Sequence, residues 1–229
     1  MKNLKGKKLI KLPSTGFWSA VFLLAFATWT VLVKFVNVKP IGPNGSSVGF
    51  AIFNEWAHAL TGYNHALYVV TDWLGLVPVG VVLCFATVGV AQLIKRKSLL
   101  KVDSDILLLG AFYALVGVVY ALCEGVVINY RPVLINGVLE ASYPSSTTML
   151  VACVMPTAIM QFNSRIKNKR LRGCVEFLTI LFISFMVVGR VVSGVHWITD
   201  IIGGGLISAS LVLAYYHFLA KVVNRLRKF

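Results

Sequence analysis

The sequence is poor in charge, and acidic residues are especially scarce. Only 13% of its 229 residues are charged, and 8 Asp and Glu face 22 Lys and Arg, which gives a formal net charge of +14. Apolar residues make up 58%, and the mean hydropathy is +0.81. This apolar content excludes a disordered basic tail, and the long uncharged runs exclude a nucleic-acid-binding domain. The composition therefore predicts a single integral-membrane domain over residues 1–229.

Paired cysteine motifs are also absent. The four Cys residues fall in or beside apolar runs, and no C-x-x-C pair occurs. Isolated cysteines of this kind behave as small buried apolar side chains, so we expect neither disulfides nor cysteine metal ligands. A metal site built from His196, Asp200 and a loop histidine lacks a further ligand at suitable spacing. We therefore expect no metal and no cofactor.

Six apolar segments approach the roughly 20 residues that a membrane-spanning helix needs. They are residues 17–35, 74–94, 106–128, 147–162, 175–195 and 198–220, and the fourth is long enough if its helix starts near Pro144. The basic leader before the first segment resembles a signal peptide. Because the apolar stretch is long and no small-x-small cleavage site follows it, we expect this helix to be retained. Residues 48–70 are semi-polar, which is typical of an interfacial helix or loop.

The sequence thus predicts an all-α polytopic membrane bundle of six transmembrane helices with an interfacial segment on its outer face. Of the 22 basic residues, 18 lie in the amino-terminal segment, after the second span, after the fourth span and in the tail. Six spans place all four segments on one side, which the positive-inside rule makes cytoplasmic. We expect a multi-pass cell-membrane protein with both termini in the cytoplasm. Of the four remaining basic residues, Arg131 and Arg190 fall at the outer ends of helices, where orientation does not explain them.

Three short segments meet at this outer level. Glu124-x6-Arg131-Pro132 closes the third span, Tyr143-Pro144-Ser145-Ser146-Thr147 opens the fourth, and Gly189-Arg190-x5-His196-x3-Asp200 joins the fifth to the sixth. The two arginines can each bind phosphate oxygens as a bidentate fork. A helix start of the Pro-Ser-Ser-Thr type directs free N–H groups outward, which also suits an anion. The end of the bundle is therefore predicted to bind phosphate.

His196 and Asp200 supply a candidate nucleophile. They are four residues apart, so on a helix they share one face. A carboxylate that accepts from one imidazole nitrogen leaves the other nitrogen free to attack. The pattern indicates phosphoryl transfer through a phosphohistidine, with the arginines neutralising the charge that develops.

These three segments resemble the signature motifs of the type 2 phosphatidic acid phosphatases. That superfamily also includes vanadium haloperoxidases and bacterial undecaprenyl-pyrophosphate phosphatases. The resemblance covers residues 124–204, within a motif-bearing core of 104–220, and six spans agree with the integral-membrane lipid phosphatase branch. It implies that His196 is the nucleophile and Asp200 its orienting partner. It also implies that the substrate phosphate is bound by Arg131, Ser145, Ser146 and Arg190.

Three positions depart from the family pattern in its first, second and third motifs. Glu124 stands in place of a Lys, Thr147 in place of the His that protonates the leaving group, and Gly189 in place of the usual Ser. Loss of a general acid typically slows a reaction about 10²–10⁴-fold. A Glu beside a dianionic substrate also adds like-charge repulsion. The first two departures predict weakened catalysis.

Two interpretations of Glu124 stay open. It either pairs with Arg131 or Arg190 and holds the helices together, or it is protonated and replaces the missing acid. Glu140, Tyr143 and His65 are weaker candidates for that acid. The leading hypothesis is a phosphatase that hydrolyses a membrane lipid phosphate or pyrophosphate at the outer leaflet of the bilayer. The alternative is a catalytically impaired relative that binds or translocates a lipid phosphate.

Overall fold

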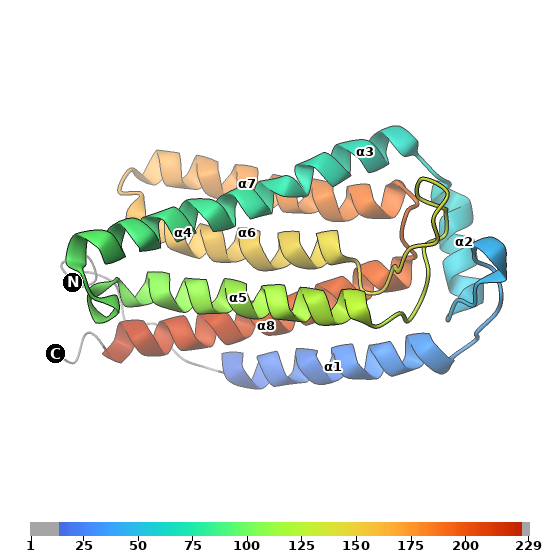
Figure 1. The fold of residues 1–229 in the computed structure, drawn as a ribbon, viewed down its shortest axis with the longest axis horizontal. Coiled ribbons are helices and arrows are strands. Elements are labelled where there is room, and N and C mark those ends of the chain that lie inside the picture. Colours follow the sequence, from blue (N-terminus) through green and yellow to red (C-terminus); the bar gives the residue numbers. More distant parts are fainter. Residues whose placement is uncertain (1–13, 226–229) are drawn as a thin grey trace.

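The computed structural model describes residues 14–225, which form an elongated bundle of α-helices lying side by side (Figure 1). Within this range the chain contains the following helices: α1 Thr15–Phe35, α2 Ala51–Thr61, α3 His65–Leu74, α4 Leu76–Arg96, α5 Ser104–Gly125, α6 Ser146–Arg165, α7 Lys169–Val192 and α8 Ile198–Arg225. Single 3-10 turns lie at Pro43–Gly45 and Leu99–Lys101. The predicted all-α bundle is confirmed.

Five segments of the bundle are long and apolar enough to cross a membrane. They are Thr15–Phe35, His65–Arg96, Ser104–Gly125, Lys169–Val192 and Ile198–Arg225. Five of the six predicted spans therefore have the expected length and composition. The remaining one, residues 147–162, is the helix α6, which runs along the middle of the bundle but is not among the five (Figure 1).

The position of α6 inside the bundle explains its lower hydropathy. Val151, Cys153 and Ala158 are fully enclosed by neighbouring side chains. Its polar residues also have partners inside the protein: Gln161 Nε2 lies 2.6 Å from the Tyr215 hydroxyl, and Arg165 lies 3.1 Å from Asp105. Because buried polar groups are tolerated when they are hydrogen-bonded, a helix surrounded by protein does not need an apolar surface all round.

The second span begins earlier than predicted. The sequence predicts that residues 48–70 lie outside the spans. Only the first part of this segment, which contains α2, lies outside the candidate spans. Asn64 caps α3 by accepting a hydrogen bond from the Leu67 N–H (3.0 Å), and α3 continues past Gly75 into α4. The candidate span therefore starts at His65 instead of Leu74. The reason is that Asn64 is a favourable helix N-cap, so its polarity starts a helix.

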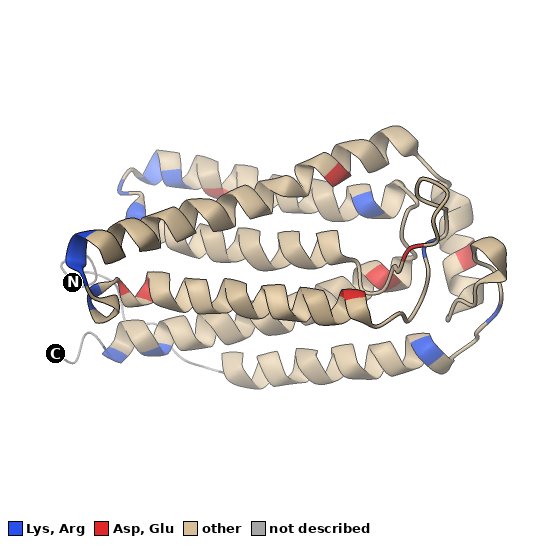
Figure 2. Ribbon diagram, viewed as in Figure 1, with Lys and Arg blue, Asp and Glu red and all other residues tan. Residues whose placement is uncertain are grey.

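Lys and Arg residues gather at the end of the bundle where α4 ends and α5 begins (Figure 2). They come from the last turn of α4, the first turn of α7 and the last turn of α8. Some of the basic residues on which the predicted orientation depends lie outside the described residues: Lys2, Lys5, Lys7, Lys8, Lys11, Arg227 and Lys228. At the opposite end of the bundle α5 and α7 end, α6 and α8 begin, and α2 crosses over them (Figure 1).

Candidate active site

A small hairpin between α5 and α6 carries Arg131 to this end of the bundle. Its turn is Asn136-Gly137, with φ of 51° and 78°, which is the sequence and backbone of a tight hairpin turn. The Arg131 N–H donates to the Glu140 carbonyl (3.0 Å) and the Ser142 N–H to the Asn129 carbonyl (2.9 Å). The hairpin thus holds Arg131 and Ser142 on neighbouring segments just before α6 begins.

The turn from α7 to α8 places His196. Gly194 has a φ of +68°, and a Cβ on it would lie 1.7 Å from the Gly62 carbonyl oxygen. Only glycine combines this backbone conformation with so close an approach. The Asn64 N–H also donates to the Ser193 carbonyl (3.0 Å), so the loop between α2 and α3 packs directly on the turn. The His196 side chain, which follows this turn, is buried.

His196 and Asp200 are linked through a third residue. The His196 Nδ1 and Asp200 Oδ2 atoms are 3.9 Å apart, too far for a hydrogen bond. The Ser142 hydroxyl lies between them, 3.0 Å from Nδ1 and 2.5 Å from Oδ2. The Trp197 N–H donates to the same carboxylate oxygen (3.0 Å). The expected orienting contact from Asp200 therefore passes through Ser142.

The contact with Arg190 identifies the tautomer of His196. Its Nη2 atom lies 3.0 Å from the His196 Nε2 atom, and a guanidinium group only donates hydrogen bonds. Nε2 must therefore accept, so the neutral imidazole carries its proton on Nδ1. Nδ1–H then donates to the Ser142 oxygen, and the Ser142 O–H donates to Asp200. One continuous hydrogen-bonded chain runs from Arg190 to Asp200.

The surroundings favour the neutral imidazole. Burial lowers the pKa of His196 well below its usual value, and the positive charges of Arg190 and Arg131 lower it further, while a hydrogen bond with the Ser142 backbone acts in the opposite direction. Both main causes penalise the imidazolium form. At neutral pH the side chain therefore keeps the lone pair on Nε2 that a nucleophile requires.

Both arginines have unused hydrogen-bond donors. Arg190 is 1% exposed, and its Nη1 lies 3.5 Å from the Thr71 hydroxyl and 3.7 Å from Asp72 Oδ1. Its guanidinium also lies over the Tyr68 ring, 5.6 Å from the centroid. The Arg190 Nε and Arg131 Nη1 atoms are buried and have no hydrogen-bond partner among residues 14–225. Since unpaired buried donors are costly, these two side chains are well suited to bind an oxyanion.

The two serines predicted to bind phosphate, Ser145 and Ser146, differ in how many hydrogen-bond donors remain free. Ser145 is fully buried and caps α6 by accepting a hydrogen bond from the Thr148 N–H (3.4 Å). Its hydroxyl donates to the Thr148 hydroxyl (3.0 Å), and its N–H donates to the Asp200 carbonyl (3.0 Å). Its donors are thus already engaged within the fold. Ser146 and Thr147 are half-buried in the first turn of α6, where N–H groups have no partner within the helix. Of the two predicted serines, Ser146 keeps a backbone donor for phosphate.

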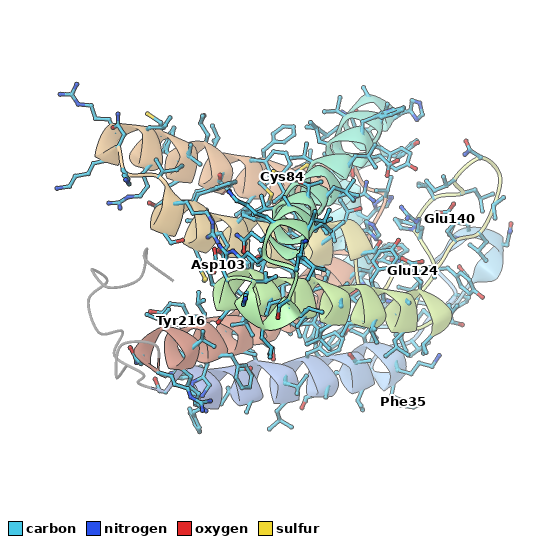
Figure 3. The ribbon with its side chains drawn as sticks, turned by 60° about the vertical axis from the view of Figure 1, so that its left-hand side comes forward. Phe35, Cys84, Asp103, Glu124, Glu140 and Tyr216 are labelled. Carbon is cyan, nitrogen blue, oxygen red and sulfur yellow. The ribbon has the colours of Figure 1, made fainter. Side chains whose placement is uncertain are left out.

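The structure does not bring Glu124 to either arginine. Its side chain is exposed on the last turn of α5 (Figure 3) and forms no ion pair among the described residues. The expected pair fails because α5 ends at Gly125, and the chain then leaves the helix axis to form the hairpin. Glu140 takes this place and lies 3.1 Å from the Arg131 Nε atom.

Gly189 has a packing role that accounts for its departure from the family pattern. A Cβ on this residue would lie 2.7 Å from the Thr71 side chain. Its absence lets α3 approach α7 closely, and this approach brings Tyr68, Thr71 and Asp72 against Arg190. None of these α3 residues was predicted, because they lie in a segment that has no resemblance to the motifs. Ser142 was also missed, although it directly precedes the Tyr143-Pro144 pair that opens the second motif.

The free hydrogen-bond donors of the site belong to the positively charged side chains of Arg131 and Arg190. Among residues 14–225 no three His, Cys, Asp or Glu side chains are grouped so that they could hold a metal ion. The arrangement suits an oxyanion held by Arg131, Arg190 and the start of α6, within reach of a neutral histidine.

Comparisons with known proteins identify the fold and the family. No curated protein sequence matches the chain significantly. The fold is similar to the crystal structure of a transmembrane PAP2-type phosphatidylglycerolphosphate phosphatase from Bacillus subtilis, with a TM-score of 0.56 and 18% sequence identity over 89% of this chain and 96% of that chain. This likeness shows the fold of a multi-pass membrane protein. The sequence profile of the PAP2 superfamily matches residues 12–223, and the chain therefore belongs to the PAP2 superfamily.

Proposed function

We propose that this protein hydrolyses a membrane lipid phosphate or pyrophosphate through a phosphohistidine at His196. The observation that carries the proposal is the buried imidazole with its proton on Nδ1 and its Nε2 atom 3.0 Å from Arg190. A nucleophile in the correct tautomer thus stands beside a guanidinium that has unused donors. The relative from Bacillus subtilis is a phosphatase of a lipid phosphomonoester, which supports the same class of substrate here.

In the first chemical step, the Nε2 lone pair attacks phosphorus. An N–P bond forms as the bond from phosphorus to the leaving oxygen breaks, and that oxygen takes the electron pair. Arg131 and Arg190 stabilise the charge on the phosphoryl oxygens. The positive charge that develops on the imidazole is balanced by Asp200 through Nδ1–H, the Ser142 hydroxyl and the carboxylate. In the second step a water attacks phosphorus, and a new O–P bond forms as the N–P bond breaks. Nε2 recovers its lone pair, and the protons of the water leave with the released inorganic phosphate.

The leaving oxygen takes its proton from water in this scheme. Thr147, at the position of the family acid, has no titratable group, and Glu124 is exposed and forms no ion pair with either arginine among the described residues. Loss of a general acid costs about 10²–10⁴-fold. The proposed enzyme is therefore slow on substrates whose leaving group is an alkoxide, and less handicapped when the leaving group is a phosphate.

We place the site at the outer leaflet. The end of the bundle that gathers Lys and Arg (Figure 2) faces the cytoplasm by the positive-inside rule. With α6 as a sixth crossing, the helix starts and ends that surround His196 lie on the opposite side. Both termini then lie in the cytoplasm, and the substrate reaches the site from the outer half of the bilayer.

The test is phosphate release by the purified full-length protein from phosphatidic acid, phosphatidylglycerol phosphate and undecaprenyl pyrophosphate in micelles. His196→Ala is expected to lower release about 10³-fold or more. His217→Ala is the matched control, because His217 lies near the other end of α8, 3.2 Å from the Thr15 hydroxyl. Radiolabelled phosphate should be trapped on the wild type and not on His196→Ala. Equal release by wild type and His196→Ala would overturn the proposal.

A second candidate function is binding or translocation of a lipid phosphate without hydrolysis. Thr147 in place of an acid favours it, while Arg131 and Arg190 keep their donors for the phosphate. The same experiment separates the two functions. If release is absent from wild type while phosphatidic acid still binds, and if Arg131→Gln weakens that binding, the second function holds.

A further inference from the structure

The Ser142 hydroxyl connects His196 and Asp200. The His196 Nδ1 atom and the Asp200 Oδ2 atom are 3.9 Å apart and form no direct hydrogen bond. The Ser142 hydroxyl lies 3.0 Å from Nδ1 and 2.5 Å from Oδ2 and so bridges them. Ser142 is 3% exposed, so water does not compete for its hydroxyl.

We propose that Ser142 is the positioning residue that couples Asp200 to the nucleophile His196. This inference rests on the proposed function and deepens it. Asp200 does not touch the imidazole, so it can set the tautomer of His196 only through the Ser142 oxygen. Because the Ser142 O–H donates to Asp200, its oxygen is left to accept from Nδ1–H. The direction of both hydrogen bonds is thereby fixed, and Nε2 stays unprotonated.

The backbone holds Ser142 for this role independently of its hydroxyl. Its N–H donates to the Asn129 carbonyl within the hairpin (2.9 Å). Asp200 is held in turn by the Trp197 N–H, which donates to the same Oδ2 atom (3.0 Å), and by the Ser145 N–H, which donates to the Asp200 carbonyl (3.0 Å). Removal of the hydroxyl alone therefore leaves both ends of the chain in place and interrupts only the link.

The charged groups that face His196 come from three elements. Arg190 approaches from α7, Asp200 from α8, and Arg131 from the hairpin. The two arginines stabilise an unprotonated Nε2, but they do not contact Nδ1. The Ser142 hydroxyl is the only side-chain group among the described residues that is hydrogen-bonded to Nδ1. Arg190 at Nε2 and the Ser142 hydroxyl at Nδ1 therefore select the neutral tautomer together.

The first test reads the tautomer directly and does not need activity. The full-length protein is labelled with nitrogen-15 histidine in micelles at neutral pH, and His196→Gln identifies the His196 signals. Wild type should show a protonated Nδ1 and an unprotonated Nε2. Ser142→Ala should shift both signals toward a mixture of tautomers, and Ser142→Thr, which keeps a hydroxyl, should restore them. Unchanged signals in Ser142→Ala would overturn the proposal.

Ser193→Ala is the matched control for this measurement. Ser193 is also fully buried and lies on the same turn as His196, but its hydroxyl donates to the Arg190 carbonyl (3.0 Å). This variant should keep the wild-type tautomer. Thermal unfolding of each variant identifies one that fails to fold, and Ser142→Ala is expected to fold because it loses a single oxygen atom.

The second test uses turnover. Ser142→Ala should lower kcat about 10- to 100-fold, as expected for loss of a hydrogen bond to a charged group, with little change in KM. In an Asp200→Asn background the same change should have almost no further effect, because the link is already broken. Independent, multiplying effects of the two changes would overturn the coupling. If wild type has no activity at all, the proposed function fails, while the tautomer measurement still decides the role of Ser142.

Discussion

The Nη2 atom of Arg190 donates a hydrogen bond to the Nε2 atom of His196 over 3.0 Å, and both side chains are buried. In the proposed mechanism, the group that binds the phosphate thus covers the lone pair that attacks it. A phosphate entering the site offers the guanidinium a charged acceptor, which forms a stronger hydrogen bond than a neutral imidazole. Substrate binding would therefore draw Arg190 onto the phosphate and free Nε2 in the same movement.

Arg190→Lys keeps a positive charge but loses the planar fork that reaches both phosphate and histidine. We expect kcat/KM to fall about 10- to 100-fold, which corresponds to the loss of one charge-assisted hydrogen bond. The measurement is initial-rate phosphate release. Lys39→Arg, an exposed change at the same end of the bundle, should behave as wild type. A Lys variant with unchanged kcat/KM would show that the fork is not used.

The acid limb of the pH–rate profile should lie below the usual histidine pKa of 6.5, because burial, Arg190 and Arg131 lower the pKa of His196. Protonation removes the Nε2 lone pair, so kcat/KM falls only as the pH drops through this lowered pKa. Arg131→Gln removes one of the causes and should move the limb to higher pH. Lys39→Gln should leave it in place. A wild-type limb above pH 6.5 would contradict this electrostatic environment.

The cluster of Arg131, Arg190, His196 and Asp200 could be predicted from the sequence because each lies in or within a few residues of the end of a helix. Helix ends follow from the lengths of apolar runs. Membrane crossings then bring residues far apart in the chain to one level. The early start of the second span at His65 could not be read in this way, because the polar residues Asn54, His58 and Asn64 hide a helix start within a segment that also contains α2.

Contacts that depend on the path of a loop could not be predicted from the sequence. The pairing of Glu124 with an arginine assumed that α5 continues toward Arg131, but the helix ends at Gly125 and a hairpin follows. The insertion of Ser142 between His196 and Asp200 depends on the pairing of that hairpin, which is a long-range property. His196 and Asp200 do approach each other, as their spacing of four predicts, but His196 lies in the turn before α8 and not on the same helix as Asp200. The spacing therefore does not determine whether they touch.

Two partly exposed carboxylates lie beside the arginines that are proposed to bind the substrate phosphate. Asp72 lies 3.7 Å from Arg190 and Glu140 lies 3.1 Å from Arg131, with side chains 58% and 41% exposed. Exposed ion pairs contribute about 0–1 kcal/mol, so Asp72→Asn or Glu140→Gln should lower KM about two- to fivefold. The effect should shrink at high salt because such charges are screened. Titration of KM against salt checks this, with the exposed Glu55→Gln on α2 as the control. A rise in KM would mean that these carboxylates orient the arginines for substrate.

Gly203 and Gly205 offer a matched pair for the packing of α8 against the site. A Cβ on Gly203 would lie 2.6 Å from the Tyr143 ring, whereas one on Gly205 would meet nothing within 4 Å. Gly203→Ala should destabilise the protein by about 1–3 kcal/mol through overpacking. Gly205→Ala should be neutral or stabilising by up to about 1 kcal/mol through helix propensity. Thermal unfolding in micelles tests this, and equal midpoints for the two variants would contradict the close approach of α8 to Tyr143.

Thr147→His should restore a general acid beside the leaving group. Thr147 is half-buried in the first turn of α6, next to Ser146. The gain in kcat should be about 10²-fold or more on phosphatidic acid, whose leaving alkoxide needs a proton. It should be much smaller on undecaprenyl pyrophosphate, because a departing phosphate is a weak base. Thr147→Gln, similar in size but without a titratable proton, should give no gain on either substrate. Equal gains on both substrates would show that the added side chain acts by binding, whereas a gain confined to the alkoxide leaving group would show that proton transfer is the element that this site lacks.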